Sequence, residues 1–178
     1  MDDKFKKNLK DFARKCRIYL NAVHIQSRIG INRLELSSRT LSDLIEKYTI
    51  DYMIGYFGKD KVQFKNWRGY DVIVILLEEK VYVNIKTQES SDTLDATWLF
   101  SASVVGELKK KNILDRLYCI KFDYVKKDKE VLEITSAKVA GPISKGELIY
   151  YTRGDTPPCR LRAEYNGTHC HLRNEFYE

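Results

Sequence analysis

Residues 67–89, WRGYDVIVILLEEKVYVNIKTQE, constrain the fold of this chain more than any other stretch. They form two mainly apolar segments joined by a polar turn, and the first segment is apolar enough to be a central strand covered on both faces. Residues two apart on a strand point to the same face, so Asn84 and Lys86 project together. Pairing the two segments as a hairpin brings Asp71 close to this polar pair.

Apolar residues recur at three- and four-residue steps before and after this hairpin, which predicts helices on both sides of it. The helix that precedes the hairpin has Thr40 as its N-cap, with Asp43 three positions on, and is apolar over most of its circumference. Shorter alternating runs predict further strands. We expect helices at residues 4–29, 41–57 and 93–111, strands at residues 61–65, 116–125 and 131–139, and two short strand-like pieces in the tail.

The chain is long enough for one compact domain, because 178 residues with 43% hydrophobic composition can bury one core. We expect a single domain over residues 1–178, with an N-terminal helix at 4–29, a core at about 40–125 and a β-rich C-terminal part at 130–178. No run approaches the roughly 20 apolar residues that cross a bilayer, and the N-terminus has no apolar signal segment. We therefore expect a cytoplasmic protein with no membrane partner.

The four cysteines, Cys16, Cys119, Cys159 and Cys170, show no CxxC spacing. Scattered cysteines fit reduced thiols in a cytosolic protein better than a disulfide framework. Cys159 with the His-Cys-His run at residues 169–171 is conceivable as a zinc site. Its spacing matches no usual pattern of paired ligands, and adjacent residues on a strand point apart. We expect small buried thiols and surface histidines instead.

The order Asp71, then Asn84-Ile85-Lys86, resembles the signature of the PD-(D/E)XK nuclease superfamily, and its context resembles a small type II restriction endonuclease. The sequence departs from that pattern at Gly69-Tyr70-Asp71, which replaces Pro-Asp, and at Asn84, which stands where the family has Asp or Glu. The resemblance implies an α/β (α+β) fold with a restriction-endonuclease-like core. In that core a central mixed β-sheet is flanked by helices in the order αβββαβ.

The resemblance also implies site residues and a metal. Asp71 is the expected primary ligand of Mg²⁺, with Mn²⁺ expected to substitute, and Lys86 lies beside the attacking water and the phosphate. Asn84 can coordinate through its carbonyl oxygen. Many nucleases of this superfamily supply another acid from the helix before the Asp strand, which points to Glu46 as a catalytic residue and metal ligand. The alternative for Glu46 is a solvated acid in the N-terminal half of its helix.

Three explanations for Asn84 stay open, because an amide brings no negative charge to the metal. Glu46 or Glu89 supplies the missing charge from a neighbouring element; or the chain is a natural relative that binds DNA without cutting it; or Asn84 was introduced in place of an aspartate. The expected function is a sequence-specific endonuclease acting on double-stranded DNA. The alternatives are a non-catalytic DNA-binding protein of the same fold and a structure-specific or repair nuclease.

A formal charge of +6 agrees with a polyanionic partner. A restriction enzyme would act as a homodimer that reads a palindrome, without a small-molecule cofactor. Its base contacts would come from side chains that reach the major groove, and the alternative for each is a phosphate contact or a plain surface residue. The candidate DNA-binding residues are Gln88, Ser90 and Ser91 beside the site and Arg153, Arg160 and Arg162 in the tail.

Overall fold

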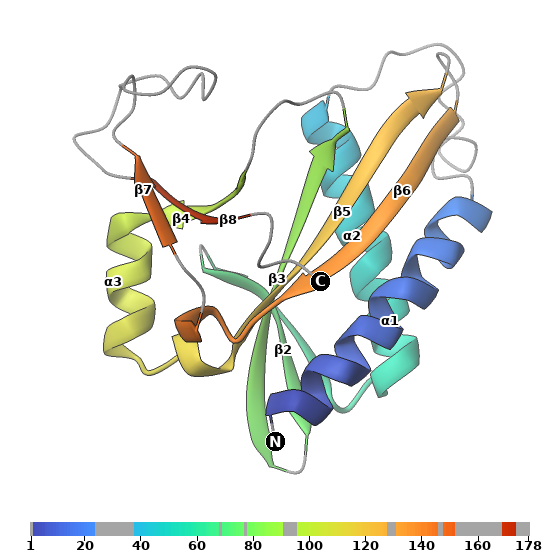
Figure 1. The fold of residues 1–178 in the computed structure, drawn as a ribbon. Coiled ribbons are helices and arrows are strands. Elements are labelled where there is room, and N and C mark those ends of the chain that lie inside the picture. Colours follow the sequence, from blue (N-terminus) through green and yellow to red (C-terminus); the bar gives the residue numbers. More distant parts are fainter. Residues whose placement is uncertain are drawn as a thin grey trace.

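A five-stranded mixed sheet with a helix layer on one face is the main body of the protein (Figure 1). The structure is a computed structural model, and it describes residues 2–23, 38–67, 69–76, 78–90, 96–127, 131–145, 148–151 and 169–173. The strand order is β1-β2-β3-β5-β6. The strands are β1 (Val62–Trp67), β2 (Tyr70–Leu76), β3 (Glu79–Glu89), β5 (Leu117–Lys127) and β6 (Val131–Ala140).

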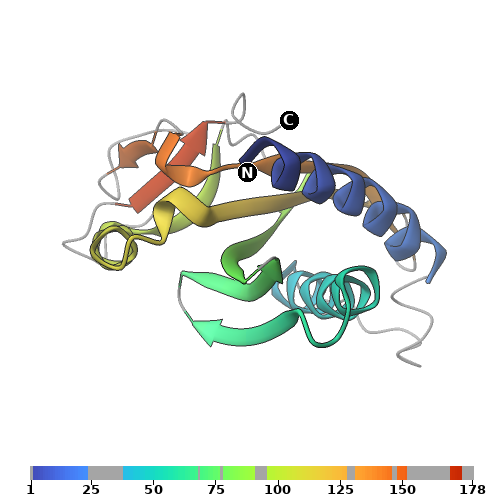
Figure 2. The ribbon, with the colours of Figure 1, turned by 90° about the horizontal axis from the view of Figure 1, so that it is seen from below.

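Two helices, α1 (Asp2–Ala22) and α2 (Ser38–Phe57), cover one face of this sheet. Figure 2 shows α1 along the β5–β6 part and α2 against the end of the sheet that holds β1 and β2. Buried side chains of α1 recur at three- and four-residue steps, as predicted, at Phe5, Leu9, Phe12, Cys16 and Leu20, and Ala13 is buried beside them. They pack with alternate residues of the strands, such as Val83 and Ile85 of β3, in one core.

The opposite face has a second and smaller core beneath α3 (Ala102–Lys110). Val104, Val105 and Leu108 of this helix pack with Leu117 and Cys119 of β5. This helix covers the sheet face from which Asn84 and Lys86 project, because Asn84 is the Cα partner of Cys119. It does so at the end where β5 begins, and the polar residues lie further along the strands.

A second sheet of three strands lies beside α3, in the order β4-β8-β7 (Figure 1). Its strands are β4 (Ala96–Ser101), β7 (Leu148–Tyr151) and β8 (His169–Arg173), and both pairings are antiparallel. Two short 3-10 helices, η2 (Leu114–Arg116) and η3 (Ile143–Lys145), complete the described elements.

The predicted fold class is confirmed. The main sheet is mixed, because β3 pairs with β2 antiparallel and with β5 parallel. The elements from α2 to β5 follow the predicted αβββαβ order, with β4 added before the second helix. β2 is a central strand with Val72, Ile73 and Val74 buried, as its apolar sequence indicates. The strands predicted at residues 116–125 and 131–139 are present as β5 and β6, which pair antiparallel.

The helix expected at residues 93–111 is wrong in its first half, where residues 96–101 form β4 and only residues 102–110 are helical. This segment reads ATWLFS, and Thr, Trp and Phe favour strands. Pairing with β8 supplies the backbone hydrogen bonds that a helix would otherwise provide. The partner strand lies about seventy positions later, so the local pattern could not reveal it.

Smaller corrections concern the first two helices. α1 ends at Ala22, with Val23 in a turn, and residues 24–29 of the predicted helix lie outside the described residues. α2 begins at Ser38, so Thr40 lies in its first turn and is not the N-cap. Cys16 and Cys119 are buried thiols. No helix in the described part of the chain is both long enough and apolar enough to cross a membrane.

Candidate active site

Asp71 lies at the point where β2 and β3 separate. The last antiparallel pair at this end is Val72 with Val83, so Asp71 and Asn84 follow just beyond it on one face of the sheet. The Asp71 Oδ2 atom accepts a hydrogen bond from the backbone N–H of Ile85 at 2.6 Å. The carboxylate therefore replaces a ladder carbonyl, and this bond holds the side chain against β3.

Asn84 is buried next to this acid, with 2% of its surface exposed. Its Oδ1 atom has no hydrogen-bond partner, the only such buried side-chain oxygen or nitrogen in the described residues. Leaving a buried polar atom without a partner costs about 1–3 kcal/mol. A site that keeps an unsatisfied carbonyl oxygen beside a carboxylate has a donor ready for a cation.

Glu46 reaches the same place from α2. One turn earlier on this helix, the hydroxyl of Ser42 shares a hydrogen bond with the hydroxyl of Thr87, which fixes the helix against β3. Burial and, to a smaller extent, the negative charge of Asp71 raise the pKa of Glu46 to about 7, while the charge of Lys86 acts in the opposite direction. Because the charges of Asp71 and Lys86 both affect its pKa, the Glu46 carboxyl lies near these two residues.

Burial also raises the pKa of Asp71, while the hydrogen bond from Ile85 and the charge of Lys86 act in the opposite direction. Lys86 is half-buried and projects from the same face of β3 as Asn84. Burial thus opposes the ionisation of both carboxyl groups, and the charge of Lys86 favours it in each. A divalent cation would relieve this penalty, because it stabilises the ionised form of both acids.

The oxygen donors fit a hard cation. Glu46 and Asp71 supply carboxylates, and Asn84 supplies the unpartnered carbonyl oxygen, which is the ligand chemistry that Mg²⁺ takes. Within the described ranges there is no cluster of three His, Cys, Asp or Glu residues that could hold a metal. Asn84 is an amide, so it does not count among these residue types, although its carbonyl oxygen has no hydrogen-bond partner.

Glu89 is not part of this group. It points to the other face of β3 and pairs with Lys126, with 3.4 Å between the Glu89 Oε2 and Lys126 Nζ atoms. Glu46 or Glu89 was expected to supply the missing charge, and the ion pair with Lys126 engages Glu89 on the other face of β3. Glu46 is the acid that the fold brings to Asp71.

The structure places two of the predicted DNA-binding residues, Gln88 and Ser90. Gln88 lies on the face of Lys86, where its Oε1 accepts a hydrogen bond from Lys121 at 3.1 Å. Ser90 follows β3 and shares a hydrogen bond with Thr135 of β6 at 3.2 Å, so it braces the sheet. The remaining candidates lie outside the described residues, and they are Ser91, Arg153, Arg160 and Arg162.

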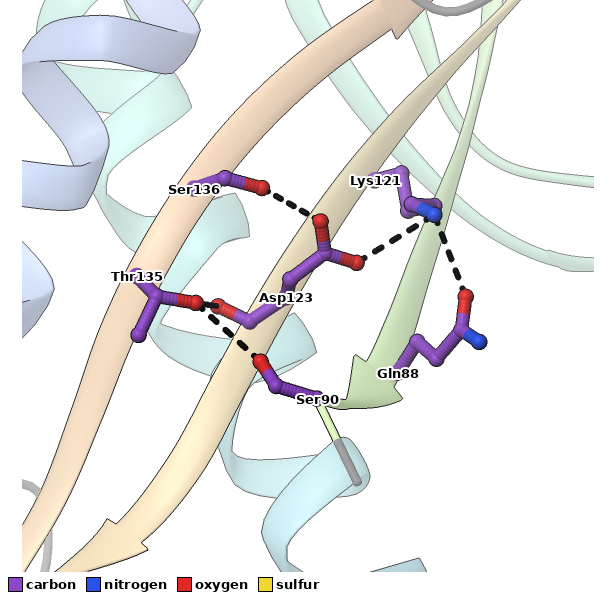
Figure 3. A network of polar contacts seen from close by, with 6 residues as sticks. All are labelled: Gln88, Ser90, Lys121, Asp123, Thr135 and Ser136. Atoms are coloured by element: carbon purple, nitrogen blue, oxygen red, sulfur yellow. Dashed lines mark hydrogen bonds and ion pairs between the residues drawn. The ribbon is translucent and has the colours of Figure 1, made fainter. Parts of the chain in front are cut away.

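Sequence reasoning missed a second polar cluster on this face. Lys121 is only 4% exposed, and its Nζ lies 3.2 Å from the Oδ1 of Asp123 (Figure 3). The alternating pattern of residues 116–125 is that of a strand, on which residues two apart such as Lys121 and Asp123 share a face. It could not predict burial, because that depends on how β3, β5 and β6 come together.

No protein-family model matches the chain, and no curated protein matches it. Among solved structures, the chain is similar to a nuclease from a fusselovirus, with 10% sequence identity and a TM-score of 0.44. The match covers 83% of this chain and 90% of that nuclease. A likeness this distant leaves the function to be argued from the residues of the chain itself.

Proposed function

We propose that this chain is a magnesium-dependent endonuclease of the PD-(D/E)XK kind, which hydrolyses phosphodiesters of double-stranded DNA as type II restriction enzymes do. The observation that supports this function is the gathering of Glu46, Asp71, the Asn84 carbonyl oxygen and Lys86 at the point where β2 leaves β3. Cleavage of a palindrome on both strands would require a homodimer, which belongs to the same proposal.

Each residue has a part in this chemistry. Bound Mg²⁺ supplies positive charge that polarises the phosphate and makes a nearby water more acidic. Glu46, Asp71 and Asn84 would hold it through oxygen atoms. The bond from Ile85 fixes one oxygen of Asp71, so the carboxylate is oriented before substrate arrives. The ammonium of Lys86 can donate hydrogen bonds to a phosphate oxygen, where negative charge grows during the reaction.

Plasmid nicking tests the proposal directly. We expect Asn84→Asp to cut supercoiled DNA with Mg²⁺ or Mn²⁺ faster than the parent chain, because the third acid strengthens metal binding. In the Asn84→Asp background, Lys86→Ala should abolish nicking and leave DNA binding in place. The matched control is Lys80→Ala, which removes an exposed lysine from the same strand and should leave nicking unchanged. If neither the parent nor Asn84→Asp nicks DNA with either metal, the enzyme reading is wrong.

Asn84 also favours a second candidate, a DNA-binding protein of this fold without catalysis. The buried amide removes one negative charge from the metal site, and binding without hydrolysis would follow. A parent chain that binds DNA but does not cut, beside an Asn84→Asp variant that does, indicates a protein whose activity this residue suppresses. Cutting of branched substrates in preference to a defined duplex sequence would indicate a structure-specific nuclease instead.

A further inference from the structure

Three lysines lie side by side across the main sheet. Lys86 of β3 is the Cα partner of Lys121 of β5, and Lys121 is the Cα partner of Lys138 of β6. Partners on neighbouring strands point to the same face. With strands about 4.8 Å apart, this lysine row extends about 10 Å from Lys86.

The positive charge of the middle lysine is compensated by partners within the sheet. Lys121 pairs with Asp123 and donates a hydrogen bond to Gln88 (Figure 3). Asp123 and Gln88 are paired with each other, two residues beyond the lysines on β5 and β3. Asp123 is itself held, since Ser136 donates a hydrogen bond to its Oδ2 and Thr135 donates one to its backbone carbonyl. These contacts offset the repulsion that like charges on adjacent strands would cause.

The two ends of the lysine row differ in their surroundings. Lys86 is close enough to Glu46 for its charge to lower the pKa of that acid. Lys138 is half-buried and forms no ion pair with any described residue. The uncompensated positive charge therefore lies at β6, on the side of Lys86 that is away from Asp71. A row of cations that starts at the reactive lysine and continues to one side matches a chain of phosphates.

We propose that the lysine row is a phosphate-binding track for the DNA strand that is cut. This inference rests on the proposed function, since it takes Lys86 as the contact to the reacting phosphate. A DNA strand carries one phosphate per nucleotide, and a row of about 10 Å is long enough to contact more than one of them. Lys138 then contacts a phosphate further along the strand, and Lys121 is a positioning residue that maintains the row between them.

Salt-dependent DNA binding tests the track. A short fluorescent DNA duplex is titrated with protein in EDTA, so that no cutting occurs, at several KCl concentrations. We expect Lys138→Gln to weaken binding several-fold and to reduce the slope of log Kd against log salt by about one. Lys138→Arg should retain parental binding. The control is Lys59→Gln, which removes an exposed lysine near β1, at the other edge of the sheet, and should leave affinity and slope unchanged.

The possible outcomes distinguish the proposed phosphate-binding track from the proposed hydrolysis. If Lys138→Gln binds as tightly as Lys59→Gln, and both match a parent that binds and cuts DNA, the track is wrong and the enzyme stands. If Lys138→Gln loses affinity but no variant cuts, the track stands and hydrolysis is wrong. A parent chain that does not bind the duplex overturns both. Far-UV circular dichroism of each variant shows that a loss of binding is not a loss of folding.

Discussion

Replacing Glu46 by glutamine should stabilise the metal-free protein at alkaline pH and not at acidic pH. Burial and the charge of Asp71 raise the pKa of Glu46 to about 7 from its ordinary value of 4.5. A carboxyl whose pKa is raised on folding favours the folded state while it is protonated, and this contribution is lost as the pH rises through about 7. Glutamine keeps the shape of the neutral acid and does not titrate.

The size of the effect follows from the pKa. A rise from 4.5 to about 7 corresponds to at most about 3.4 kcal/mol in the free energy of unfolding. Glu46 is only half-buried, so water screens part of this cost, and about 1.5 kcal/mol is a reasonable expectation. For a chain of this length, that corresponds to roughly 3–6 °C in Tm.

Thermal unfolding in EDTA at pH 5 and pH 8.5 measures the effect. We expect Glu46→Gln and the parent to have nearly equal Tm values at pH 5 and the variant to be more stable at pH 8.5. Asp51→Asn is the matched control, because it removes an exposed acid from the same helix. Adding Mg²⁺ at pH 8.5 should raise the Tm of the parent more than that of the variant. An equal difference in Tm at both pH values would refute the placement of Glu46 beside Asp71.

Two further predictions concern groups elsewhere in the core. Asp123→Asn should lower the free energy of unfolding by about 2 kcal/mol, because it leaves the buried ammonium of Lys121 without its counter-charge. The Tm of this variant should therefore fall, whereas that of Asp115→Asn, which removes an exposed acid, serves as the control. Equal Tm values for the two variants would contradict this prediction. The Cys16 thiol should resist alkylation at pH 8 in the folded protein, because burial raises its pKa to about 12. Mass spectrometry after iodoacetamide treatment, with and without urea, measures this, and rapid labelling without urea would disprove it.

The fold was predictable where local patterns and tertiary structure agree. The alternation in β2 and β3 identified the central hairpin, because side chains on those strands are sorted by face within a few residues. Prediction from local patterns failed in β4, which forms by pairing with β8. Strand pairing over such a separation leaves no periodic signal near either strand, so an amphipathic spacing at residues 93–111 was read as one helix.

The candidate site shows the same division. Asp71, Asn84 and Lys86 could be placed together from spacing alone, since a hairpin brings them to one face. The role of Glu46 as their neighbour needed the resemblance to a nuclease family, and its electrostatic coupling to Asp71 needed the structure. Lys121 escaped notice because its importance comes from the parallel pairing of β3 with β5, which no local pattern specifies.

The second sheet also bears on how such a protein can diverge. β7 and β8 pair at their ends, with Tyr151 opposite His169, so the segment between them starts and finishes at one place on the sheet. Lengthening a connection whose two ends are paired costs little entropy, about 0.6 kcal/mol for each doubling of its length. None of these strands belongs to the sheet that holds Asp71 and Lys86. Insertions between β7 and β8 can therefore accumulate during evolution while the geometry of the candidate site stays unchanged.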